Sequence, residues 1–334
     1  MVKRVTLKDV AARAGVSFST VSRALNDRPE ISTETKAQVR AACKELGYIP
    51  NIAARSLVSR RTRTIGLLVP DISNDYFAGA ALAIEEAARE NGYRVLLCNS
   101  LRDSAREAEA VDALLSQQVE GLIVAPVSAA SADSLQDSLR SLPHVYLGNN
   151  HGDDCSYVVI DNKRGAYEAT RYLLCLGHRN ILYLGGRQGS LTRQFRVSGF
   201  YKAMEEVPGA QAQQKIECDC AQETYRMIRA LLGRRELPDA VFAYSDRIAL
   251  QVLQAADECG VDIPKQLSLV GFDNISYASL PRINLTTVSQ HKRQVGRTAV
   301  LRLFEQIQGK VGRTVDILQP ELIIRGTCHR RAAR

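Results

Sequence analysis

Two hydrophobic periodicities divide this chain. From Thr64 onward, short runs of consecutive apolar residues alternate with longer stretches in which apolar residues recur every three or four positions. The first pattern is typical of strands buried on both faces, and the second is typical of amphipathic helices. Their regular alternation predicts doubly wound parallel sheets with helices on both faces.

The alternation forms two successive series, which predicts two lobes. The strands expected in the first are IGLLVPD, YRVLLCNS, EGLIVAPV and HVYLGNN, with helices around 77–91, 104–117 and 131–140. Those expected in the second are YVVIDN, NILYLGG, the region of Ile216, AVFAYSD and LSLVGFDN, with helices around 163–176, 195–206, 222–233 and 247–259. Chain order alone assigns the helix expected at 292–308 and the strand expected at 321–326 to neither lobe. Ligands of such folds bind at the carboxyl ends of strands, so a ligand site is expected in the cleft between the lobes.

The first sixty residues carry only helical periodicity. Thr6 is expected to cap a short helix that ends at Gly15, and a second short helix follows it after a tight turn. Ser32 or Thr33 is expected to cap a third helix that ends before Gly47. Two helices joined by a glycine-containing turn, with a third behind them, form the helix-turn-helix pattern.

The segment after Pro50 is a linker. Residues 51–61, NIAARSLVSRR, favour a helix by composition, but a helix of this length is marginal in water. We therefore expect it to become ordered only when something else holds it.

The excess charge of the chain lies in the same N-terminal part. The 334 residues carry 44 Lys and Arg against 36 Asp and Glu, a net charge of +8. Residues 1–63 alone hold 13 basic and 5 acidic side chains, so the rest of the chain is balanced. Such asymmetry is expected when one small module contacts a polyanion.

The stretch VSFSTVSRALN, Val16–Asn26, joins hydroxyl side chains to one arginine at the start of the second helix. Short hydroxyl side chains suit contacts with phosphates and base edges, and an arginine reaches the O6 and N7 atoms of guanine. A surface helix that happens to be rich in Ser and Thr is an equal alternative for the stretch taken alone. Its place inside the basic module favours DNA binding.

Other classes of protein find little support in the sequence. No apolar run reaches the 18 or so residues of a membrane span, and MVKRVTLKDV lacks the apolar core of a signal peptide, so a cytoplasmic protein is expected. The eight cysteines are scattered and are expected to be reduced thiols, and Cys218 with Cys220 lacks the two further ligands of a metal site. Neither a Gly-x-Ser-x-Gly elbow nor a Gly-Lys-Ser/Thr loop occurs, and LGGRQGS lacks the Gly-x-Gly-x-x-Gly spacing. We expect no enzyme, no cofactor and no metal.

Polar residues follow several of the expected strands. Carboxylates, amides and arginines suit a polyhydroxylated ligand because hydroxyls both donate and accept hydrogen bonds. For any one of them a helix cap or turn is an equal alternative, and Asp273 with Asn274 looks structural. The residues in question are Asp71, Asn74, Asp75, Asn149, Asn150, Asp161, Asn162, Asp246 and Asp273.

Several segments together resemble one known family. VTLKDVAARAGVSFSTVSRALN, LGYIPNIAARSL, IGLLVPDISNDYFAGA, LSLVGFDN and LTTVSQ resemble, in order and spacing from Val5 to about Arg325, the LacI/GalR family of bacterial transcription regulators. The resemblance implies a helix-turn-helix domain, a hinge helix, and a core like type I periplasmic sugar-binding proteins. It also implies a homodimer on a pseudo-palindromic operator, with a small molecule in the cleft. The implied boundaries are 1–49 for the DNA-binding domain, 50–62 for the hinge, 63–161 plus 291–320 for the N-terminal lobe, and 162–290 plus 321–334 for the C-terminal lobe.

The resemblance also implies which residues act. Leu57 matches the leucine that the family wedges into the minor groove, where unstacking a base step is offset by the bend that it permits. Cys220 stands where many relatives carry a stacking aromatic ring, and Gly148 with Asn149 stands where many carry an aspartate. The DNA-binding residues implied are Thr6, Leu7, Ser17, Phe18, Ser19, Thr20, Ser22, Arg23, Asn26, Asn51, Ala54 and Leu57. The effector-binding residues implied are Tyr76, Phe77, Asn149, Thr192, Arg196, Cys220 and Asp246.

These observations predict an α/β core of two doubly wound parallel-sheet lobes behind an all-α helix-turn-helix domain. We expect a homodimeric transcription regulator, a repressor, whose operator affinity depends on a sugar or related metabolite. Two alternatives stay open. One is a two-lobed sugar-binding protein or enzyme with an accessory basic segment, and the other is a regulator that answers to a protein partner.

Overall fold

The computed structural model describes residues 5–25, 27–48, 61–149, 155–187, 189–215, 221–233, 237–310 and 312–331. The chain divides into two compact units, Met1–Thr62 and Arg63–Arg334, each with a hydrophobic core of its own. The linker helix expected at 51–61 lies outside the described residues, apart from its last position.

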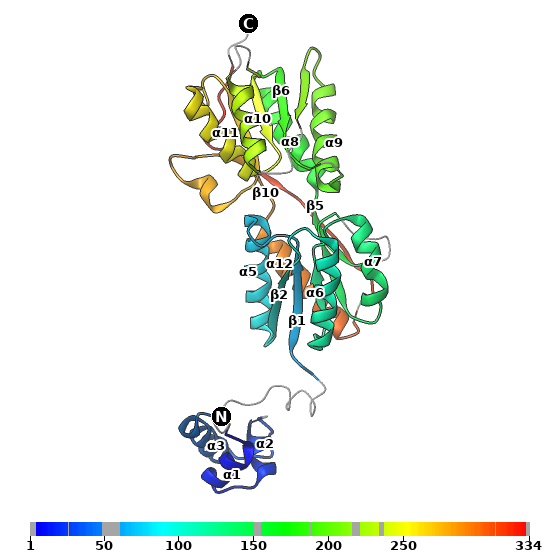
Figure 1. Cartoon of the computed structure of the whole chain (residues 1–334), viewed down its shortest axis with the longest axis vertical. Helices are drawn as coiled ribbons and strands as arrows, with labels where there is room; N and C mark the ends of the chain where they lie inside the picture. Colours follow the sequence, from blue (N-terminus) through cyan, green and yellow to red (C-terminus); the bar gives the residue numbers. More distant parts are fainter. Residues whose placement is uncertain are drawn as a thin grey trace. The chain divides into compact units, whose positions relative to one another are not determined.

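The first unit contains α1 (Leu7–Ala14), α2 (Phe18–Leu25) and α3 (Thr33–Leu46), as Figure 1 shows. Thr6 caps α1 through a capping box with Asp9, and Ser32 caps α3. Gly15 and Gly47 end α1 and α3 at φ values of 61° and 63°, which glycine adopts without strain. The helix-turn-helix pattern and its caps are therefore confirmed. Its core is built from Val10, Ala14, Val21, Ala24, Val39 and Ala42.

The first lobe of the second unit is built on a six-stranded parallel sheet in the order β11-β5-β4-β3-β1-β2. Helices α5 and α12 cover one face, and α6 and α7 cover the other. The strands are β1 (Thr64–Val69), β2 (Arg94–Asn99), β3 (Leu122–Val124), β4 (His144–Leu147), β5 (Tyr157–Ile160) and β11 (Val315–Leu318). The helices are α5 (Asp75–Glu90), α6 (Ser104–Ser116), α7 (Ala129–Leu139) and α12 (Lys292–Ile307).

The second lobe repeats this plan on a sheet in the order β12-β10-β9-β8-β6-β7, in which β12 runs antiparallel to β10. Its strands are β6 (Asn180–Leu184), β7 (Gln211–Lys215), β8 (Ala240–Ala243), β9 (Ser268–Asp273), β10 (Thr286–Ser289) and β12 (Glu321–Ile323). Its helices are α8 (Asn162–Cys175), α9 (Leu191–Glu205), α10 (Ala221–Leu232) and α11 (Asp246–Cys259), with a 3₁₀ turn at Ser276–Ser279. The predicted fold class is confirmed.

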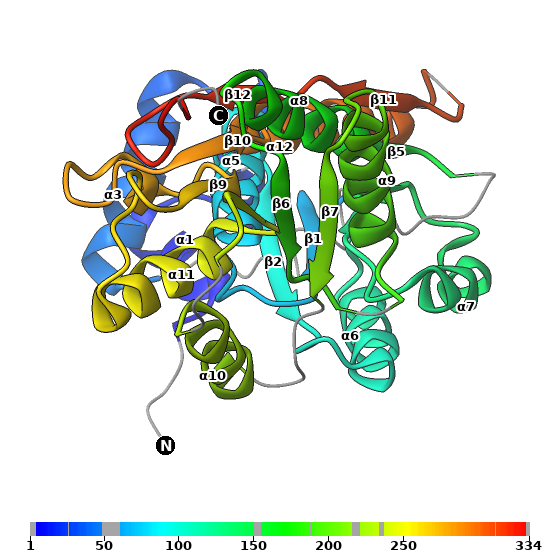
Figure 2. The same cartoon turned by 90° about the horizontal axis from the view of Figure 1, so that it is seen from above.

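Alternate residues of a central strand pack against the helices on opposite faces of the sheet. In β6, Ile181 and Tyr183 pack against α8 and α9, whereas Leu182 and Leu184 pack against α10 and α11. Figure 2 shows these two helix pairs on opposite sides of the strand. A strand buried on both faces has no polar side, which explains why the four buried residues after Asn180, ILYL, form an unbroken apolar run.

The chain crosses between the lobes at three places in the described residues: between β5 and α8, between β10 and α12, and between β11 and β12. The two late segments that chain order left open are thereby assigned. Helix α12 packs on α5 and gives Val295, Ala299 and Leu303 to the core of the first lobe. Strand β12 joins the sheet of the second lobe.

Helices α8 and α9 approach each other through backbone atoms. A methyl group at Gly199 would lie 2.1 Å from the carbonyl oxygen of Lys163 and 3.0 Å from the amide nitrogen of Tyr167. No side chain larger than hydrogen fits between two backbones at that distance. The pairing of these helices therefore depends on glycine at position 199.

The stability of the second lobe is expected to fall in mild acid because of His178. Its fully buried ring donates from Nε2 to the carbonyl oxygen of His329 at 3.1 Å, and burial lowers its pKa from 6.5 to about 4. The folded state favours the neutral ring. Its contribution to the free energy of unfolding is therefore complete above pH 6.5 and is lost as the pH falls through 4. The free energy of unfolding should drop by up to about 3 kcal/mol across this range.

Urea denaturation at a series of pH values measures this effect. Gln can still donate to the carbonyl oxygen of His329 but does not titrate, so the His178→Gln variant should show a flatter pH profile than the native chain. Parallel profiles for the two proteins would contradict the assignment.

Candidate DNA-binding surface and ligand cleft

The start of α2 presents polar and aromatic side chains to solvent. The Ser17 hydroxyl accepts a hydrogen bond from the Thr20 amide at 3.1 Å and therefore caps the helix. It also lies 2.8 Å from the hydroxyls of both Ser19 and Thr20. Phe18, the first residue of α2, is 52% exposed, while Val21 and Ala24 are buried beneath it. A large exposed ring at a helix start has no role in the core of this unit, and it is available to a partner.

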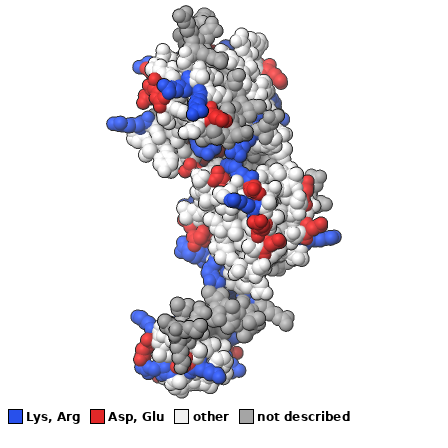
Figure 3. All heavy atoms as spheres, viewed as in Figure 1, with Lys and Arg blue, Asp and Glu red and all other residues white. Residues whose placement is uncertain are grey.

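The other predicted DNA-binding residues are distributed over the same unit. Thr6 is exposed and holds the start of α1, Leu7 and Ser22 are half-buried, and Arg23 is exposed. Lys and Arg side chains are spread over the surface of this unit, as Figure 3 shows. Asn26, Asn51, Ala54 and Leu57 lie outside the described residues, so the expected minor-groove wedge stays a prediction.

A cavity of about 420 Å³ lies between the two lobes of the second unit. It is lined at the carboxyl ends of the strands, for instance by Pro70 after β1, Ala125 after β3 and Tyr244 after β8. This is the position expected for a ligand site in doubly wound folds. Of the predicted effector-binding residues, those that line the cavity are Tyr76, Phe77, Asn149, Thr192 and Arg196.

Arg196, on α9, is the centre of a buried network in this cavity. Its Nε donates to the Asn162 side-chain oxygen at 2.8 Å, its Nη1 donates to the carbonyl oxygen of Tyr244, and its Nη2 lies 3.7 Å from an oxygen of Asp273. The guanidinium also lies against the ring of Phe272, 3.5 Å from its centroid. A guanidinium held on several sides is preorganised, so little entropy is lost when it binds a ligand.

Asn162 connects this network to the first lobe. Its side-chain nitrogen donates to the side-chain oxygen of Asn149 at 2.9 Å and to the carbonyl oxygen of Ile160 at 3.1 Å. Asn149 follows β4, and Asn162 begins α8 just after the first crossing. The contact therefore joins the two walls of the cleft.

The sequence favours Asp246 as a ligand-binding residue and Asp273 as a structural one, but only Asp273 lines the cavity. Asp246 is fully buried and does not line the cavity, because its carboxylate accepts hydrogen bonds from the Ile275 amide at 2.9 Å and from the Thr287 hydroxyl. Asp273, interpreted above as structural, lines the cavity and accepts a hydrogen bond from the Gln290 amide.

Backbone geometry sets Asp273 apart as well. It has a φ of 120°, a strained conformation for a side chain other than glycine, and such strain is concentrated at binding sites. Burial raises the pKa of both carboxyls, that of Asp273 against the opposing effect of Arg196. We therefore correct the interpretation of Asp273 as a purely structural turn.

The first lobe contributes an aromatic wall. The rings of Tyr76 and Phe77 meet edge to face with centroids 5.1 Å apart. Burial raises the pKa of Tyr76 to about 12, so its hydroxyl stays protonated and can donate to a ligand. Cys220, the predicted substitute for a stacking ring, lies outside the described residues. Sequence reasoning missed Tyr244 and Gln290, although each stands directly after a strand of the second lobe.

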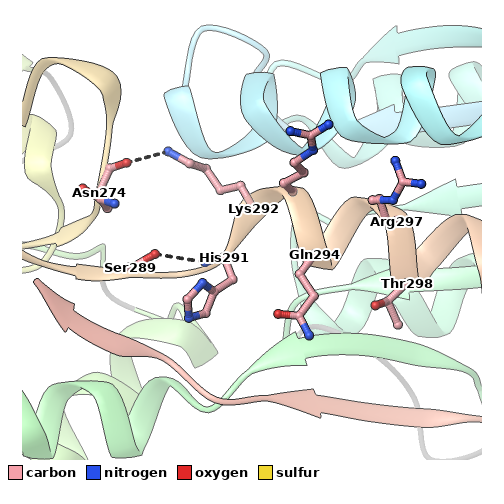
Figure 4. A pocket seen from close by; sticks show the side chains of 8 residues that line it. Asn274, Ser289, His291, Lys292, Gln294, Arg297 and Thr298 are labelled. Atoms are coloured by element: carbon pink, nitrogen blue, oxygen red, sulfur yellow. Dashed lines mark hydrogen bonds between the residues drawn. The ribbon is translucent and has the colours of Figure 1, made fainter.

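A second cavity, of about 520 Å³, lies at the crossing between β10 and α12 (Figure 4). The Lys292 ammonium donates to the carbonyl oxygen of Asn274 at 3.0 Å. The two arginines that line it form ion pairs with carboxylates of α5. Arg293 lies 3.4 Å from a carboxylate oxygen of Glu86, and Arg297 forms a bidentate ion pair with Glu90. With both arginines paired to carboxylates and the lysine bound to a backbone carbonyl, this cavity is less suited to a ligand than the cleft.

The described ranges hold no sign of two other kinds of site. Within those ranges, no three His, Cys, Asp or Glu side chains gather in a way that would hold a metal ion. No helix among the described residues is long and apolar enough to cross a membrane.

Comparison with known proteins gives matches over nearly the whole chain. Residues 6–51 match the model for bacterial regulatory proteins of the lacI family, and residues 62–325 match that for periplasmic binding proteins and the sugar binding domain of the LacI family. The HTH-type transcriptional repressor PurR of Pectobacterium carotovorum is 36% identical over 311 residues, which cover 91% of each chain.

Two solved structures are similar in fold. The lac repressor dimer bound to operator and the anti-inducer ONPF superposes with a TM-score of 0.85 at 28% identity, over 98% of this chain and 100% of that one. A complex of the transcriptional regulator CelR with cellobiose superposes with a TM-score of 0.72 at 29% identity, over 97% and 100%.

Proposed function

Because this chain belongs to the LacI family of bacterial regulatory proteins, we propose that it represses transcription as a homodimer on a pseudo-palindromic operator, under the control of a small molecule. It is a sequence-specific DNA-binding regulator with a ligand-binding core. The effector is a sugar or related metabolite held in the cleft, and the protein acts in the cytoplasm without catalysing a reaction. The observation that carries this proposal is the cleft, whose preorganised Arg196 joins both lobes through Asn162 and Asn149.

The chemistry of the cleft supports a polar ligand. Arg196 and Asn162 offer donors, Asp273 offers acceptor oxygens, and Tyr76 offers a hydroxyl that stays protonated. Hydroxyl groups of a sugar match such a mixed set because each can both donate and accept. CelR, with cellobiose in its structure, is a relative of similar fold that binds a sugar.

Exposed apolar side chains on the first lobe support the homodimer. Leu82 on α5 is 62% exposed, and Leu97 on the neighbouring edge strand β2 is 47% exposed. Edge strands and helices that leave leucines in water are typical of surfaces buried in an assembly. The lac repressor that superposes on this chain is a dimer on its operator.

Selection from random-sequence DNA with the full chain tests the proposal. The recovered sites should share a pseudo-palindrome, since a two-fold dimer contacts two half-sites alike. Phe18→Ala should weaken binding to the selected site about 5-fold to 150-fold, the range for loss of one base-edge contact, and should leave binding to unrelated DNA nearly unchanged. Fluorescence anisotropy at fixed salt measures both affinities.

Gln38→Ala provides the control, because Gln38 is exposed on α3 of the same unit and belongs to no predicted contact. It should bind both DNAs like the native chain. Recovery of sites without two-fold symmetry would argue against the dimer. Equal losses of Phe18→Ala on both DNAs would remove Phe18 from base recognition.

A further inference from the structure

Lys292 lies where the chain crosses from β10 of the second lobe to α12 of the first. A methyl group at Gly79 would lie 3.1 Å from its Cδ atom, so the carbon chain of the lysine packs directly on α5. From there the ammonium reaches the carbonyl oxygen of Asn274 at 3.0 Å, as Figure 4 shows. A half-buried side chain that packs on the first lobe thus holds the backbone of the second.

The turn that Lys292 holds has a strained backbone. Asp273 and Asn274 follow each other with φ values of 120° and 47°. Such conformations persist only where the surrounding structure holds them. The Asn274 amide donates to the Thr287 hydroxyl at 3.4 Å, and Arg325 donates to the Asn274 side-chain oxygen at 2.9 Å. Both of these contacts come from the second lobe, whereas the hydrogen bond from Lys292 comes from the first.

The turn presents one of two neighbouring buried carboxyls. Asp273 lines the cleft, and Asp246 is buried beside it. Burial raises the pKa of Asp273 to about 7 against the opposing charge of Arg196, and the charge of Asp246 adds to the rise. The charge of Lys292 lowers the pKa of both carboxyls, so the lysine favours their ionised forms.

The titratable groups that act on this pair come from both lobes. Arg196 of α9 and Arg325 after β12 belong to the same lobe as the carboxyls. Tyr76 of α5 belongs to the first lobe, but burial raises its pKa to about 12 and it stays neutral. Of these groups, Lys292 is therefore the charge that the first lobe supplies.

We propose that Lys292 is a positioning residue for the cleft, which holds the strained turn from the first lobe and supplies a countercharge that keeps Asp273 ionised. This inference rests on the proposed function, since Asp273 lines the same cleft. An ionised carboxylate accepts hydrogen bonds through both oxygens, whereas a protonated one gives up part of that capacity. The strength with which the cleft accepts hydrogen bonds from ligand hydroxyls therefore depends on a contact between the lobes.

The variant Lys292→Met tests the countercharge without any ligand, because methionine keeps an unbranched side chain on α5 and removes the ammonium. Loss of the hydrogen bond to Asn274 costs the same at every pH. Loss of the charge raises the pKa of Asp273 further, so its cost appears only where Asp273 is ionised.

The pH range follows from the direction of this shift. A carboxyl with a raised pKa stabilises the fold fully below 3.8, its ordinary value, and loses this contribution as the pH rises through its pKa in the fold. In Lys292→Met the loss extends to higher pH. Relative to the native chain, the melting temperature of the variant should fall by about 3 °C more at about pH 8.5 than at about pH 5. Differential scanning calorimetry of the full chain measures the difference.

Three further variants separate charge from packing. Lys310→Met is the matched control, since Lys310 is exposed after α12 and does not line the cleft, and it should melt like the native chain at both pH values. Lys292→Arg keeps the charge and should restore most of the native pH profile. In an Asp273→Asn background, Lys292→Met should lose most of its pH-dependent effect, because the carboxyl on which the charge acts is gone.

Ligand binding is measured with ribose, glucose and cellobiose as probes, by thermal shift of the full chain at about pH 7. A sugar that stabilises the native chain should bind Lys292→Met at least about 5-fold more weakly, as expected for loss of one charge-assisted interaction, and Lys310→Met equally well. Equal affinities of such a sugar for the native chain and Lys292→Met would overturn the inference.

The outcomes separate this inference from the proposed function. A melting difference that is the same at both pH values, or one that survives intact in the Asp273→Asn background, overturns the role of Lys292 as a countercharge. If the difference depends on pH as expected and none of the sugars binds the native chain, Lys292 is the countercharge and the sugar effector is wrong. A chain that selects no operator refutes the proposed function, whatever the variants of Lys292 show.

Discussion

A chain that begins at Arg63 is expected to lose sequence-specific DNA binding, by at least about 10³-fold, and to keep the thermal response of the full chain to cleft ligands. The first unit holds the exposed start of α2 and most of the excess of positive charge, with 12 basic against 5 acidic side chains. The second unit has its own cores, and each residue that lines the cleft belongs to it. The two functions should therefore separate when the chain is cut between the units.

Electrophoretic mobility shift on the selected operator, together with a thermal shift on the strongest cleft ligand, measures the two functions. The full-length Phe18→Ala variant is the control, because it weakens operator binding without any cut and should keep the ligand response of the native chain. Loss of the ligand response in the shortened chain alone would mean that the second unit depends on the first. Retention of operator binding by the shortened chain would place the recognition surface elsewhere.

Gly199→Ala is expected to lower the free energy of unfolding of the core by about 3 kcal/mol, the upper end of the usual cost of overpacking. The added methyl group would lie 2.1 Å from the carbonyl oxygen of Lys163, and a backbone atom cannot turn aside as a side chain does. The gain of up to about 1 kcal/mol from replacing glycine within a helix does not offset this clash. Differential scanning calorimetry should show the melting temperature of the core lowered by about 5 °C.

Gly312→Ala is the matched control. A methyl group at Gly312 would meet no atom within 4 Å, and its backbone is not in the left-handed region. This variant should melt within about 1 °C of the native chain, in line with other surface substitutions. If both variants melt alike, then α8 and α9 can separate without cost, and the close approach does not hold the second lobe together.

The sequence predicts the fold best where strands are buried on both faces. Every residue of β1 and β9 is buried, so each reads as an apolar run with a defined end. Strand β7, Gln211–Lys215, lies at the edge of its sheet and has the sequence QAQQK, so it carries almost no apolar signal. The sequence predicts this strand only as the region of Ile216, a residue outside the described ranges, and the described strand covers Gln211–Lys215. Edge strands need less apolar surface, which is why periodicity locates them poorly.

The cleft is predicted only in part, because a polar residue after a strand does not reveal which way it points. Asp246 and Asp273 both stand at the carboxyl end of a strand. Hydrogen bonds from Ile275 and Thr287 hold the carboxylate of Asp246 away from the cavity. Asp273, whose φ is 120°, lines the cavity instead. Neither hydrogen bond partner is near in sequence, so no local pattern distinguishes the two aspartates. The arginines that line the cleft, Arg102, Arg187, Arg196 and Arg247, are far apart along the chain, so no local pattern predicts that they share one cavity.

The three crossings between the lobes also determine the order in which the protein can fold while it is being synthesised. The first unit is continuous in sequence and leaves the ribosome complete. The first lobe has to wait for α12 and β11, which are translated after all the strands from β6 to β10 of the other lobe. Until then, the apolar face that Val295, Ala299 and Leu303 will cover stays open, a surface of the kind that chaperones bind. A nascent chain thus carries a finished DNA-binding unit well before it carries a core that can respond to a ligand.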